Sequence, residues 1–109
     1  MSSPRNTLLQ GTLDLLVLET LARGPRHGYA IARWLEETTN DALRIEEGSL
    51  YPALYRMEER GWIDASWGRS DTGQRIKVYS LTAQGRKQLR VETARWAAFT
   101  GAVAKVARA

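Results

Sequence analysis

The sequence predicts a mainly helical protein with one small β-hairpin, in the order helix, helix, helix, hairpin, helix. Apolar residues recur at helical spacing over residues 11–23, 27–38 and 49–60, and again from residue 82 to the end. Residues 63–81 instead alternate apolar and polar side chains around the turn-forming stretch "GRSDTGQR". This order is that of a winged helix-turn-helix followed by a C-terminal dimerisation helix.

The first two helices are bounded by glycine and proline. Residues 11–23 are apolar on nearly all sides, apart from Asp14 and Glu19, which predicts a central, buried helix. "RGP" at 23–25 ends it, because the glycine suits the position after the last turn and the proline cannot continue a helix. The second helix then places Ile31, Trp34 and Leu35 on one stripe.

The third helix contains Pro52, which is tolerated most easily near a helix start. Ser49, or a residue just before it, is the expected N-cap, so that Pro52 falls in or near the first turn. Gly61 is expected to cap the C-terminus in a left-handed conformation. The inward-facing residues are expected to be Leu50, Leu54 and Met57.

The last helix begins near Thr82, a good N-cap. Its apolar residues fall on heptad a and d positions, which predicts a seam for a partner helix, although Glu92 interrupts it. The seam residues are Leu89, Trp96, Phe99, Val103 and Val106. We therefore expect two functional parts, a winged helix-turn-helix over residues 1–81 and a dimerisation helix over residues 82–109.

Size and composition restrict the possible classes of protein. A chain of 109 residues fits one domain of ordinary size, and an apolar helix without an internal partner favours a homodimer. With no cysteine and a single histidine, no cofactor, metal site or enzyme is expected. The N-terminal "MSSPRN" lacks the features of a secretion signal, so the expected location is cytoplasmic, with no membrane partner.

Charge is distributed unevenly along the chain. Residues 1–64 hold seven Arg or Lys and ten Asp or Glu, a net charge of −3, whereas residues 65–109 hold nine and two, a net charge of +7. A basic half is typical of proteins that bind a polyanion, although basic residues can also simply solvate a helix.

The predicted recognition surface is the outer face of the third helix together with the hairpin. Short or planar polar groups suit the base edges of the major groove, and basic residues on the hairpin suit phosphates. Arg56 could reach either a guanine edge or a phosphate. The candidate DNA-binding residues are Tyr29, Ser49, Tyr51, Tyr55, Arg56, Arg69, Gln74, Arg75 and Lys77. Tyr79 is expected in the core.

Three segments resemble signature blocks of the PadR family of bacterial transcriptional regulators. These are "LDLLVLETLARGPRHGYAIARWL", "EEGSLYPALYRMEERGWI" and "YSLTAQGRKQL", with "HGY" at 27–29 and "GSLYPAL" at 48–54 the most specific. The resemblance implies a homodimeric winged-helix repressor that binds double-stranded DNA at a palindromic operator. It places the recognition helix at 49–56 and the wing at 73–79, where Gln74, Ile76 and Val78 interrupt the usual basic run.

The resemblance also implies a possible effector site at Trp96, with Phe99 beside it. The short chain with a single C-terminal helix resembles the smaller PadR subclass. Drug-sensing members of that subclass carry a tryptophan at the matching position, where it stacks planar aromatic compounds. Trp96 could equally serve only to pack the dimer interface. A winged-helix module that binds protein rather than an operator is the alternative function.

Overall fold

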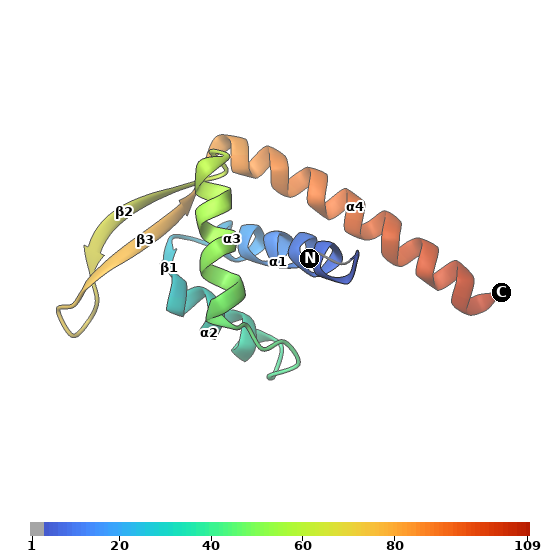
Figure 1. Cartoon of the computed structure of the whole chain (residues 1–109), viewed down its shortest axis with the longest axis horizontal. Coiled ribbons are helices and arrows are strands. Elements are labelled where there is room, and N and C mark those ends of the chain that lie inside the picture. The colour runs from blue at the N-terminus through green and yellow to red at the C-terminus, as the bar shows by residue number, and fades with distance from the viewer. Residues whose placement is uncertain (1–3) are drawn as a thin grey trace.

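A computed structural model of the chain describes residues 4–109, with side chains described from residue 11 onward. Over these residues the chain forms four helices and one three-stranded antiparallel sheet of order β1-β3-β2 (Figure 1). The elements are α1 (Pro4–Leu21), β1 (Arg26–His27), α2 (Gly28–Thr38), α3 (Glu47–Glu59), β2 (Ile63–Arg69), β3 (Arg75–Leu81) and α4 (Ala83–Arg108). The predicted winged helix-turn-helix with a long final helix is confirmed. Residues 1–3 of the N-terminal segment discussed above lie outside the described part.

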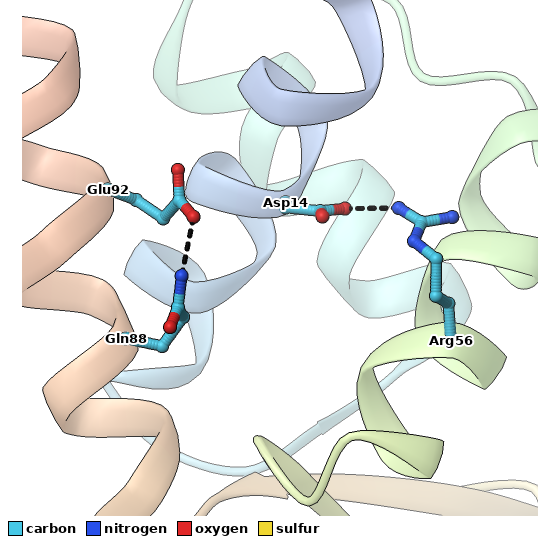
Figure 2. A network of polar contacts seen from close by, with 4 residues as sticks. All are labelled: Asp14, Arg56, Gln88 and Glu92. Carbon is cyan, nitrogen blue, oxygen red and sulfur yellow. Dashed lines mark hydrogen bonds and ion pairs between the residues drawn. The ribbon is translucent and has the colours of Figure 1, made fainter. Parts of the chain in front are cut away.

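Helix α1 is central, as its apolar composition predicted. It lies between α4 on one side and α2 and α3 on the other (Figures 1 and 2). Because it has neighbours on several sides, it buries apolar side chains around much of its circumference. The core consists of Val17, Leu18, Leu21, Ile31, Leu35, Leu50, Ala53, Leu54, Met57, Ile63 and Tyr79. The predicted inward positions on α3 and the predicted burial of Tyr79 are therefore confirmed.

Strand β1 was not predicted. Arg26 pairs with Tyr79 and His27 with Val78, so this short strand adds a third member beside β3. Arg26 also donates from Nη1 to the backbone carbonyl of Thr20 at 2.7 Å, which ties the strand to the end of α1. A strand of two residues has no alternation to detect, and His27 is the N-cap of α2 rather than its first residue.

The start of α3 differs from the prediction. The N-cap is Glu46, not Ser49 or its immediate neighbour, and Pro52 lies inside the helix in its second turn. The bond that Pro52 cannot donate would have gone to Gly48 one turn earlier, and both residues are exposed, so water can hydrate the carbonyl instead. The negative charge of Glu47 in the first turn interacts favourably with the helix dipole.

The C-terminus of α3 closes with the predicted glycine cap. Gly61 has φ +77°, and its N–H donates to the carbonyl of Glu58 while that of Trp62 donates to Met57, both at 3.0 Å. This pair of bonds is the Schellman arrangement, which satisfies the last carbonyls of the helix. It also turns the chain directly into β2.

Helix α4 starts from a tightly packed joint with the residues just after α3. Thr82 is its N-cap and accepts from the backbone N–H of Gly85 at 2.9 Å, as predicted, while its own hydroxyl donates to the carbonyl of Gly61 at 2.7 Å. Gly85 is buried against the backbone of Trp62, where any Cβ would collide with the Trp62 carbonyl oxygen. The direction of α4 is therefore fixed by contacts at its first turn. None of the helices in the described part is both long and apolar enough to span a bilayer.

Candidate nucleic-acid interface

Three tyrosines and one serine form an exposed surface on α2 and α3. Tyr51 and Tyr55 lie one turn apart on α3, Ser49 precedes them, and Tyr29 lies in the first turn of α2. All four side chains are exposed, although tyrosines bury well when a partner is available. Their hydroxyls make the surface capable of both hydrogen bonding and apolar contact.

Gly28 joins the two helices of this surface. The Tyr51 ring occupies the space that a side chain at Gly28 would need, because a Cβ there would lie 2.7 Å from ring carbon Cε1 and 2.8 Å from the hydroxyl oxygen. His27 and Tyr29 stack beside it, with ring centroids 6.3 Å apart. The "HGY" segment stood out in the sequence, but nothing in it indicated that the Tyr51 ring packs against Gly28.

The β2–β3 hairpin has an ordered, basic tip. Arg69 donates from Nη1 to the carbonyl of Gly73 at 2.9 Å, and Ser70 Oγ accepts from the backbone N–H of Gln74 at 3.1 Å. Gly73 has φ +84°, a conformation that favours glycine. The side chains of Arg69, Gln74 and Arg75 are exposed at this tip. Three of the four predicted hairpin residues are therefore available to a ligand.

Lys77, the fourth, is engaged with α3. Its Nζ lies 3.1 Å from Oε1 of Glu58, and this hydrogen bond raises the pKa of Lys77 above its usual value of 10.5. The ammonium also lies 5.5 Å from the ring centroid of Tyr79. Burial raises the pKa of Tyr79 in turn. Lys77 therefore links the hairpin to α3 as well as adding charge.

Arg56 does not lie on the outer face of α3. Its Nη2 is 2.6 Å from Oδ1 of Asp14 on α1, and the two side chains are only 25% and 10% exposed (Figure 2). Burial raises the pKa of Asp14 above 3.8 even though Arg56 acts to lower it. The expectation that Arg56 faces a base or phosphate is not met in this arrangement, because the buried carboxylate draws the guanidinium inward.

Helix α4 carries an apolar strip that its own chain leaves largely uncovered. Leu89 packs against the core, but Trp96 is 42% exposed and the exposure reaches 77% at Val106. Glu92, which interrupts the predicted seam, instead faces α1 and accepts from Nε2 of Gln88 at 2.6 Å (Figure 2). The exposed strip consists of Trp96, Phe99, Val103 and Val106.

A hollow of about 330 Å³ lies between the middle of α1 and the middle of α4. The rings of Trp96 and Phe99, with centroids 5.9 Å apart, form part of its wall. The other lining residues are Gly11, Thr12, Leu15, Glu92 and Arg95. The two residues predicted for an effector are thus brought together at a concave, mostly apolar surface.

A protein-family model described as "Transcriptional regulator PadR-like family" matches residues 17–91. The chain belongs to the PadR family. The match covers the C-terminal end of α1 (residues 17–21), then β1, α2, α3, the hairpin and the first third of α4. It ends just before the exposed strip.

The chain is also similar to solved structures of transcriptional regulators and to a curated protein sequence. A transcriptional regulator from Clostridium thermocellum is 27% identical with a TM-score of 0.83, over 91% of this chain and 96% of that one. A PadR family transcriptional regulator from Eggerthella lenta is 33% identical with a TM-score of 0.77, over 92% and 85%. Protein X of Lysinibacillus sphaericus is 30% identical over 93 residues, which is 85% of each chain. As a PadR-family member the chain is a DNA-binding transcriptional regulator and not an enzyme.

Proposed function

We propose that the chain acts as a homodimeric repressor in the cytoplasm. Two copies pair through residues 82–109, residues 1–81 of each copy bind one half of a palindromic operator, and an aromatic or drug-like effector releases the DNA. The observation that carries the proposal is the exposed tyrosine surface of α2 and α3 beside a basic, ordered hairpin.

Pairing through α4 is supported by its apolar strip. The C-terminal half of α4 extends beyond the rest of the chain, so the chain itself offers little to cover it (Figure 1). Burying apolar surface yields about 25 cal/mol per Å², which favours covering the strip with the same strip of a second copy. A dimer of this kind presents two recognition helices about 34 Å apart, the distance between successive major grooves.

Operator contact divides into base readout and backbone contact. Ser49, Tyr51 and Tyr55 on α3 have the exposure and chemistry to reach base edges, and Tyr29 borders them. The hairpin supplies polar and basic side chains that can bind phosphates or enter the minor groove, namely those of Arg69, Gln74, Arg75 and Lys77. Arg56 is left out of the proposed contact set, because Asp14 holds its guanidinium.

The effector proposal depends on the hollow beside Trp96. Its volume is at the lower end of small-molecule sites, and an exposed indole face can stack a planar ring. Titration of planar aromatic dyes should quench tryptophan fluorescence in the wild type and not in Trp96→Ala. Quenching that persists in Trp96→Ala, with the dimer intact, would reduce Trp96 to a packing residue.

The central test combines oligomeric state with DNA binding. Sedimentation should give the mass of a dimer, and fluorescence anisotropy should show binding to DNA from upstream of the protein's own gene. Because phosphate contacts release counterions, affinity should fall by orders of magnitude between about 50 and 200 mM salt. A stable monomer would contradict the dimer. A dimer that ignores every duplex at low salt would favour the protein-binding module instead.

A further inference from the structure

Trp67 is a large aromatic residue on the hairpin that is 60% exposed. In the register of β2 and β3 it lies directly opposite Lys77, and the next facing pair toward the tip is Arg69 with Arg75. Side chains two residues apart on a strand share a face, so the ring lies on the same face as these three cations. Closer to the core the same face carries the buried residues Ile63 and Tyr79. Along this face of the hairpin, the side chains are thus buried near the core and become exposed from Trp67 toward the tip.

The guanidinium of Arg75 stacks on this ring. Its Cζ lies 4.3 Å from the ring centroid, the shortest of the five cation–aromatic distances among the described side chains. Arg75 is diagonal to Trp67 across the two strands, a spacing that long side chains and aromatic rings bridge. The stack restricts the rotamers of an otherwise free surface arginine, so less entropy is lost when it binds a ligand.

The charges around Trp67 identify the kind of occupant. Lys77 is partly neutralised by Glu58, but the guanidiniums of Arg69 and Arg75 have no carboxylate partner within 4 Å among the described residues. Such a surface repels a second copy of itself and attracts a polyanion. The sugar–phosphate backbone of DNA offers both parts of a matching partner, apolar deoxyribose faces for an indole and phosphates for a guanidinium.

We propose that Trp67 and Arg75 act together as one contact to the DNA backbone. The indole face lies against deoxyribose, and the ring holds Arg75 extended toward the adjacent phosphate. This role rests on the proposed operator binding and adds to it a residue and a mechanism. It makes Trp67 both a contact residue and the positioning residue for Arg75. Because sugars and phosphates are the same in every sequence, the contact strengthens binding to all duplexes equally.

Affinity measurements on paired duplexes test this role. Trp67→Ala should weaken binding to the operator and to a scrambled duplex of equal length by the same factor, about three- to tenfold. Trp67→Phe, which keeps a ring, should lose less. Ser66→Ala, on the opposite face of the same strand, is the matched control and should bind like the wild type. Thermal melts confirm that each variant is folded.

The salt slope and the double variant separate positioning from loss of charge. Trp67→Ala keeps every cation, so its slope of log affinity against log salt should equal that of the wild type. Arg75→Ala removes one phosphate contact from each subunit of the proposed dimer and should therefore reduce the slope by about 1.8. Trp67→Ala combined with Arg75→Ala should lose less than the product of the two single losses. If the double variant loses affinity by the full product of the two single losses, Trp67 and Arg75 act independently and the proposed coupling is wrong.

Fluorine NMR locates the indole without any loss of function. The chain has four tryptophans, so protein labelled with 5-fluorotryptophan gives four signals, of which the Trp67 signal is identified by its absence in Trp67→Phe. Duplex DNA should shift that signal. An unmoved signal, or Trp67→Ala with wild-type affinity while Arg75→Ala binds weakly, would overturn the proposal and leave operator binding intact. Failure of the wild type to bind any duplex would instead overturn the proposed function.

Discussion

Asp14 of α1 holds the guanidinium of Arg56 of α3 across 2.6 Å, with both side chains largely withdrawn from water. Helix α3 is therefore anchored to the central helix by an ion pair as well as by apolar packing. Burial is the main reason that the pKa of Asp14 is raised, and repulsion from Glu92 on α4 adds a smaller contribution. Figure 2 shows the Asp14–Arg56 pair and the Gln88–Glu92 pair as two separate contacts on either side of α1.

Arg56→Met should destabilise the fold by about 3 kcal/mol at pH 7, because it leaves the Asp14 carboxylate buried without a partner. Adding Asp14→Asn to Arg56→Met should recover most of this loss. Arg33→Ala is the control, because its pair with Glu37 is 51% and 65% exposed and should contribute less than about 0.5 kcal/mol. Urea denaturation measures all four proteins, and equal losses in Arg56→Met and Arg33→Ala would contradict the prediction.

The raised pKa of Asp14 predicts a specific pH dependence. The folded protein holds the Asp14 proton more tightly than the unfolded chain, whose pKa is near 3.8, so stability declines as pH rises from that value through the raised pKa. Asp14→Asn removes this decline. The difference in free energy of unfolding, variant minus wild type, should therefore grow as pH increases from about 3 to 7. The growth should be confined to the pH interval between the unfolded and the folded pKa of Asp14. A constant or shrinking difference would show that pairing with Arg56 outweighs burial.

Gly28→Ala should displace the Tyr51 ring, because the new methyl group would need space that the ring fills. The ring is the far end of a flexible side chain, so the stability cost should stay below about 1 kcal/mol while operator affinity falls about tenfold. Anisotropy and thermal melts measure the two effects. In a Tyr51→Ala background the same change should cost no further affinity, and a further loss there would assign Gly28 a separate role.

Gly85→Ala should destabilise the protein by about 2–3 kcal/mol, because its Cβ meets backbone atoms of Trp62 that cannot move aside. Gly101→Ala is the matched control on the same helix, where nothing lies within 4 Å of a new Cβ. It should be neutral or stabilise by up to about 1 kcal/mol through helix propensity. Calorimetry compares the two, and similar melting temperatures would refute the close packing at the joint.

Base readout and backbone contact predict different mutational signatures. Ser49→Ala or Tyr51→Phe should change the ratio of operator affinity to random-duplex affinity, because each alters a hydrogen bond at a base edge. Arg75→Ala should weaken both affinities by one factor and leave the ratio unchanged. If all three variants change the ratio alike, the assigned roles are wrong.

Local patterns in the sequence were enough to predict most of the fold. Gly61 and Thr82 carry their signals in the residues themselves, a left-handed cap and a hydroxyl N-cap, and both predictions are confirmed. The hairpin alternation likewise gave both strands. Strand β1 was not predicted because a strand of two residues shows no alternation of apolar and polar side chains. The start of α3 was placed too late because its N-cap, Glu46, makes no side-chain hydrogen bond to the helix and is not a typical capping residue.

The candidate site was less accessible to sequence reasoning, since it depends on contacts between distant residues. Asp14 and Arg56 are 42 positions apart, and only the packing of α1 against α3 reveals that the arginine turns inward. The packing of the Tyr51 ring against Gly28 and the exposure of Trp67 likewise depend on how the folded elements come together. Helical or strand spacing specifies a face but not what covers it.

Because α4 is long and packs tightly near Thr82 and Gly85, a small tilt there produces a large displacement at its far end. At 1.5 Å per residue its 26 residues span about 39 Å, so a tilt of about 5° at the joint moves the far end by about 3.4 Å. In the proposed dimer the far ends are held together, and the same tilt instead swings the two halves of the molecule apart. In that dimer, the distance between the two copies of α3 would depend on a small angle at Gly85.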